Sequence, residues 1–67
     1  MVYLIVGLDR RTFARWHENV MAPDARTAAG IARERAAAEG VRLVVAAAIG
    51  PYASIEDFAD GAVAEAA

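Results

Sequence analysis

The sequence predicts an α+β fold, in which a three-stranded antiparallel or mixed sheet carries one Ala-rich helix on one face. Residues 2–8 and 13–22 are alternating apolar segments separated by a short polar turn. Residues 23–40 have helical periodicity with a marker at each end, and residues 41–50 are again apolar and rich in β-branched side chains. Together these segments indicate a β-β-α-β order within a single domain, residues 1–67.

The first two segments are expected to pair as a hairpin. Residues 2–8 are apolar at both alternating sets of positions, which is typical of a strand covered on both sides. The even positions hold Val2, Leu4, Val6 and Leu8, and the odd ones hold Tyr3 and Ile5. In residues 13–22, the inward set holds Trp16 and Val20, and the polar row on the other set consists of Arg15, His17 and Asn19.

A helix is expected over residues 23–40. Asp24 suits the N-cap position, because its carboxylate can accept hydrogen bonds from the free amides of the first turn. Gly40 suits the left-handed position after the last turn. One side of the helix carries small side chains only, which permits close packing on a sheet but buries little area. This alanine stripe consists of Ala25, Ala28, Ala29, Ala32 and Ala36.

The third strand, residues 41–50, completes a β-β-α-β module over residues 1–52. A helical crossover makes the second and third strands parallel, so the simplest sheet order is 2-1-3. Residues 53–67 are expected to form a short C-terminal helix or a tail. Apolar residues recur there at helical spacing from Ile55 and Phe58 onward, and Ser54 with Asp57 resembles a capping box.

The composition argues against most kinds of catalytic chemistry. The chain has no cysteine, which excludes a disulfide framework, a thiolate zinc site and a cysteine nucleophile. With a single histidine, a zinc site would have to rely on carboxylates. We therefore predict no catalytic residue, no cofactor and no metal. No apolar run approaches the ~20 residues that span a bilayer, and the expected location is the cytoplasm, away from membranes.

The helix should leave one face of the sheet uncovered. An apolar face of this size is difficult to leave exposed on a stable monomer, and a chain of 67 residues commonly needs a stabilising device such as oligomerisation. The alternation assigns to this face Tyr3, Ile5, Phe13, Arg15, His17, Met21, Val44, Ala46 and Ala48. We expect a homodimer through this face or through the edge of the third strand, with the C-terminal helix or another protein as alternative cover.

The candidate contact residues for a partner or ligand are Arg15, His17, Asn19, Tyr3 and Val44. The polar row lies along one side of a strand and could bind an anion or border a dimer contact, although a solvated polar row is the simpler interpretation. His17 and Glu18 point to opposite faces, so their adjacency does not make an acid–base pair.

A second set of candidates lies at the hairpin. Arg10, Arg11 and Arg15 could straddle a phosphate backbone, as β-ribbon readers of DNA do. A charged turn is the simpler interpretation. The net charge of −2 and the pI of about 5.2 make nucleic acid a disfavoured partner, because nucleic-acid-binding domains usually carry a basic excess.

The stretch from Arg15 to Pro51 resembles a family of small proteins from high-GC Gram-positive bacteria. It carries the pattern W-H-x-N-V-x-A-x-D, then an Ala/Arg-rich helix, then L-V-V-A-A-x-I-G-P. The resemblance implies a bacterial source and, for some members, genes near plasmid-transfer or integrative elements. The family has no assigned function, so no catalytic residue is carried over. The β-β-α-β order is also similar in topology to archaeal ribosomal protein LX, whose basic character this chain lacks.

These observations favour a non-enzymatic, self-associating interaction or accessory module. The alternative is a nucleic-acid-binding regulator that uses the arginine-bearing hairpin. A third hypothesis is a small-ligand binder at the exposed sheet face, through His17 and Asn19.

Overall fold

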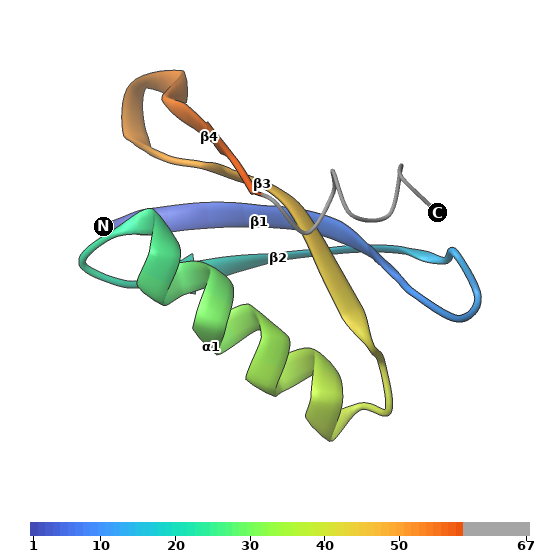
Figure 1. Cartoon of the computed structure of the whole chain (residues 1–67). Coiled ribbons are helices and arrows are strands. Elements are labelled where there is room, and N and C mark those ends of the chain that lie inside the picture. The colour runs from blue at the N-terminus through green and yellow to red at the C-terminus, as the bar shows by residue number, and fades with distance from the viewer. Residues whose placement is uncertain (59–67) are drawn as a thin grey trace.

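The computed structural model describes residues 1–58, in which one helix lies across one face of a four-stranded antiparallel sheet (Figure 1). The strands are β1 (Val2–Asp9), β2 (Arg15–Met21), β3 (Leu43–Ile49) and β4 (Ile55–Asp57), in the order β2-β1-β3-β4. The helix α1 (Ala25–Ala38) connects β2 to β3, and the short 3-10 turn η1 (Pro51–Ala53) precedes β4. The α+β class and the predicted 2-1-3 arrangement of the first three strands are confirmed.

The predicted sheet lacked the fourth strand. Residues Ile55–Asp57 pair with β3 instead of starting a helix, with Ile55 opposite Ile49 and Asp57 opposite Ala47. The amide of Phe58 then donates to the carbonyl of Ala46 at 3.1 Å. Pairing prevails because the edge of β3 offers backbone hydrogen bonds, whereas a short isolated helix is marginal in water. The rest of the predicted C-terminal helix, residues 59–67, lies outside the described residues.

The ends of α1 agree with the sequence markers. The carboxylate of Asp24 accepts a hydrogen bond from the amide of Thr27 at 2.7 Å, and this bond lowers the pKa of Asp24 below its usual value. At the other end, Gly40 adopts a φ of 80°, the left-handed conformation expected after a helix. The whole predicted alanine stripe is buried against the sheet.

The core between helix and sheet is thin and depends on a few larger side chains. Ile5, Val20 and Val45 are the largest side chains that are fully buried among the described residues. They lie opposite the alanine stripe, with Tyr3 and Ala48 beside them. Trp16 packs against this cluster at its margin.

The two faces of β1 are the reverse of the prediction. Tyr3 and Ile5 are 9% and 0% exposed on the face that α1 covers, because the register places Tyr3 opposite the inward-facing Val20. The alanine stripe leaves space that only larger side chains can fill. The face that α1 leaves uncovered, the open face, is formed by Val2, Leu4, Val6, Leu8, Arg15, His17, Asn19, Met21, Val44, Ala47, Ile49, Ile55 and Asp57.

A bulge in the β1–β3 pairing explains a further difference. Val6 pairs with Ala47 whereas Gly7 pairs with Val45, so Ala46 is an extra residue on β3. The alternation predicted that Val44, Ala46 and Ala48 share the open face. Beyond the extra residue the side chains exchange faces, so Ala47 lies on the open face and Ala48 is buried, 1% exposed.

Candidate interaction surface

The open face is an ordered set of cross-strand rows. Adjacent strands place paired residues side by side on the same face, and the registers define three rows that cross the sheet from β2. The first row is Asn19, Leu4, Ile49 and Ile55, the second is His17, Val6, Ala47 and Asp57, and the third is Arg15, Leu8 and Val44. Each row therefore begins with a polar side chain on β2 and becomes apolar on β1 and β3.

The middle of the open face is an apolar strip over β1 and β3. Its side chains are half-buried, and they are Leu4, Val6, Leu8, Val44, Ala47 and Ile49. Larger apolar side chains at the margins are well exposed, with Met21 68%, Ile55 65% and Val2 48% exposed. No described residue of this chain covers the strip, because α1 packs on the other side of the sheet (Figure 1).

The two margins of the open face carry opposite charges. Arg15 lies exposed on β2, the strand at one edge of the sheet, on the same face as the polar side chain of His17, and Asp57 lies exposed on β4 at the other edge. Three strand spacings separate these edges, about 14 Å. His17 and Asp57 belong to the same row. A surface with this arrangement can offer a partner an apolar centre with a cationic side and an anionic side.

The structure brings together four of the five predicted contact residues. Arg15, His17, Asn19 and Val44 all lie on the open face. Tyr3 does not, because it is buried beneath the helix. The residues that the sequence reasoning missed on this face are the even positions of β1, Ile49 and the two β4 residues. The even positions of β1 were missed because both faces of residues 2–8 are apolar. Ile55 and Asp57 were missed because residues 54–67 have apolar residues at helical spacing.

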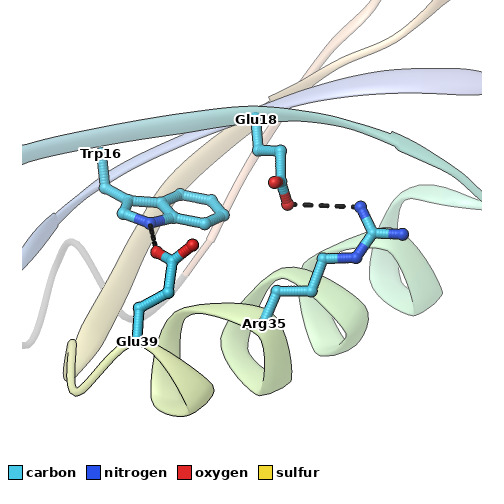
Figure 2. Close-up of polar contacts among 4 residues, drawn as sticks. All are labelled: Trp16, Glu18, Arg35 and Glu39. Atoms are coloured by element: carbon cyan, nitrogen blue, oxygen red, sulfur yellow. Dashed lines mark hydrogen bonds and ion pairs between the residues drawn. The ribbon is translucent and has the colours of Figure 1, made fainter.

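Two polar contacts on the opposite, covered face fasten α1 to β2 (Figure 2). The indole nitrogen of Trp16 donates to Oε1 of Glu39 at 3.4 Å, and Nη1 of Arg35 lies 3.2 Å from Oε2 of Glu18. Both contacts are solvent-exposed. Trp16 and Glu18 therefore help to hold α1 on the sheet. The polar row of Arg15, His17 and Asn19 lies on the other face of β2 and takes no part in these contacts.

The hairpin arginines point to different surroundings. The guanidinium of Arg11 donates to the carbonyl of Gly40 at 2.8 Å, after the end of α1, whereas Arg15 belongs to the open face. Arg10 is exposed in the turn, where its amide donates to the carbonyl of Arg42 at 2.8 Å. The turn itself is closed by Asp9, whose carboxylate accepts from the amide of Arg11 at 2.8 Å. Nucleic-acid contact by these three arginines stays a prediction.

The predicted edge of the third strand is occupied. β4 pairs with Ala47, Ala48 and Ile49, so this stretch of β3 is no longer available for pairing with another chain. The pairing of β4 with β3 does not block the other predicted contact, which uses the open face.

Within residues 1–58, no three His, Asp or Glu side chains are grouped closely enough to hold a metal ion. The same part of the chain has no helix with the length and apolar character needed to cross a membrane. Comparison with protein-family models, curated proteins and solved structures found no match. The resemblance noted for Arg15 to Pro51 therefore stays a prediction, and the open face carries the functional argument.

Proposed function

We propose that the protein is a self-associating, non-enzymatic interaction module whose contact surface is the open face. The single observation that carries this proposal is the apolar strip over β1 and β3, which no residue among 1–58 covers on the far side of the sheet from α1. Soluble domains usually cover such a sheet face with a second layer.

A second copy of the chain is the occupant that fits best. The open face has an apolar centre and carries positive charge at one margin and negative charge at the other, so it can complement itself. The core under α1 is built largely of alanine, which contributes little stability because each residue buries little apolar area. Covering the open face would add the burial that a small domain needs.

The dimensions of the face predict a reversible dimer. At about 4.8 Å strand spacing and about 3.3 Å rise per residue, three strands of seven or eight residues and the three-residue β4 give roughly 400 Å² in projection. Specific complexes of standard size bury about 800 Å² per partner. The face is therefore smaller than a standard specific interface, and we expect a weak dimer whose formation depends on protein concentration.

Sedimentation equilibrium of the full chain across micromolar to millimolar concentrations tests the proposal. We expect a monomer–dimer equilibrium that Val6→Arg abolishes, since Val6 lies in the middle of the apolar strip. Ala37→Arg is the matched control, because it adds the same charge to an exposed position of α1 and should leave association unchanged. Circular dichroism establishes that both variants are folded.

A chain that stays monomeric at millimolar concentration contradicts the proposal. So does a dimer that responds to Ala37→Arg and not to Val6→Arg, because its contact would then lie on the helix side. A monomer whose stability falls on removal of residues 59–67 would identify the C-terminal segment as the cover.

A further inference from the structure

Two copies of this chain can face each other in different orientations, and the charges on the open face select one. Building on the proposed self-association, we infer that the dimer axis runs nearly parallel to the strands, so that β2 of one copy lies over β4 of the other. The cationic Arg15 then faces the partner's anionic Asp57 on both sides of the dimer.

The selection follows from the symmetry of a two-fold contact, in which the same surface is used by both copies. An axis across the strands would place β2 over β2 and bring the cationic margins together. An axis along the strands exchanges the margins, so each cationic edge meets the anionic edge of the other copy. Like charges placed together are unfavourable, and the second arrangement avoids them.

The rows of the open face support the same orientation. An axis along the strands keeps each row opposite itself, so His17 lies over the partner's Asp57 while Val6 lies over the partner's Ala47. In the next row, Leu4 lies over the partner's Ile49. A larger side chain thus meets a smaller one in the row of Val6, which helps two sheet faces to interdigitate. Two such sheets pack at the small angle that sheet twist imposes.

Arg15 has no paired residue of β4 in its own row, because β4 ends at Asp57. Its long side chain lies one row from His17 and can reach the partner's Asp57 diagonally. The other acidic residue of β4, Glu56, pairs with the buried Ala48 and therefore lies on the covered face. Asp57 is accordingly the acidic group that this orientation uses.

Charge exchange within one chain tests the orientation. Each of Arg15→Glu and Asp57→Arg should weaken the dimer about tenfold, because each substitution acts at both ends of a symmetric contact. The double variant Arg15→Glu/Asp57→Arg should return the dissociation constant close to that of the natural chain. Arg26→Glu and Glu34→Arg are matched controls on exposed positions of α1 and should change nothing.

Cross-linking gives a second readout that leaves all charges in place. The chain has no cysteine, so single cysteines can be added at Asn19 and Ile55, the two ends of one row. With a short bifunctional thiol reagent, a mixture of Asn19→Cys and Ile55→Cys chains should form the cross-linked dimer. Neither variant should do so alone.

The outcomes separate this inference from the function on which it rests. A natural chain that remains monomeric overturns both. A natural chain that dimerises while the double variant binds no better than the single ones overturns the orientation alone. Cross-linking of Asn19→Cys with itself would instead indicate β2 over β2.

Discussion

The indole Nε1 of Trp16 donates a hydrogen bond to Oε1 of Glu39 at 3.4 Å and so joins the edge strand β2 to the end of α1 (Figure 2). Trp16 is the only tryptophan in the chain. Its fluorescence should therefore report whether α1 is docked on the sheet. Several stability predictions can be measured with this natural probe.

Gly7→Ala should destabilise the fold strongly. A Cβ at this position would lie 2.1 Å from the carbonyl oxygen of Val44, across the bulge, and the backbone would have to separate. We expect a loss of about 3 kcal/mol in the free energy of unfolding, measured by urea denaturation. Gly30→Ala is the matched control in α1. Beyond the backbone of its own helix and its chain neighbours, a Cβ there meets no atom of the described residues within 4 Å, so alanine should stabilise the helix by about 1 kcal/mol. Equal effects at the two positions would contradict the observed bulge.

The Glu18–Arg35 contact should contribute little to stability and should weaken with salt. The two side chains are 38% and 50% exposed, and exposed ion pairs are typically worth about 0.2–1 kcal/mol. A double-mutant cycle with Glu18→Gln and Arg35→Gln should give a coupling energy in that range at low salt and near zero at high salt. A coupling that survives high salt would show that the pair is shielded from solvent.

Phe13→Gly and Tyr52→Gly should each raise stability. Both residues have left-handed backbone conformations, with φ of 62° and 60°, which cost a bulky side chain roughly 1–2 kcal/mol. Their side chains are 73% and 103% exposed, so little burial is lost on substitution. We expect a gain of about 0.5–1 kcal/mol for each in thermal or urea unfolding. Arg10→Gly is the comparison in the same turn as Phe13. Arg10 does not have a left-handed backbone conformation, so glycine there should bring no such gain. A destabilised Phe13→Gly would indicate that the aromatic ring makes a contact that stabilises the turn.

Acid should remove the stabilisation that Asp24 gives to α1. The hydrogen bond from Thr27 lowers the pKa of Asp24 from its ordinary value of 3.8. The contribution is therefore complete at pH values above that value and disappears as the pH falls through the lowered pKa of the folded state. The stability difference between the natural chain and Asp24→Ala should narrow below about pH 4. Unfolding followed by circular dichroism at successive pH values measures this stability difference. A difference that stays constant down to pH 2 would show that ionised Asp24 is not the cap.

The local signals in the sequence predicted α1 well. Asp24 and Gly40 mark real helix ends, and the alanine stripe identifies the buried side, because these features depend on neighbouring residues only. The inward position of Trp16 and Val20 and the outward position of the polar row were also predictable. The clear polar–apolar alternation of β2 determines both.

The faces of β1 could not be predicted because both are apolar. Whether the odd or the even positions of β1 turn toward α1 depends on the cross-strand register. Tyr3 is paired with the inward-facing Val20 in that register and so lies on the same face. The bulge at Ala46 was equally hidden, since it arises from the pairing of Gly7 with a strand more than thirty residues away. Ile55 and Asp57 were missed because spacing alone does not reveal that a nearby sheet edge can pair with them.

The short length of β4 has a consequence for the proposed self-association. This strand contains three residues, yet it supplies Asp57 and Ile55 to one margin of the open face and closes the edge of β3. Release of β4 would simultaneously erase the acidic margin and expose a backbone edge prone to unregulated pairing. The proposed dimer would therefore form only when β4 is paired with β3, and a chain with β4 released would be prone to aggregate instead.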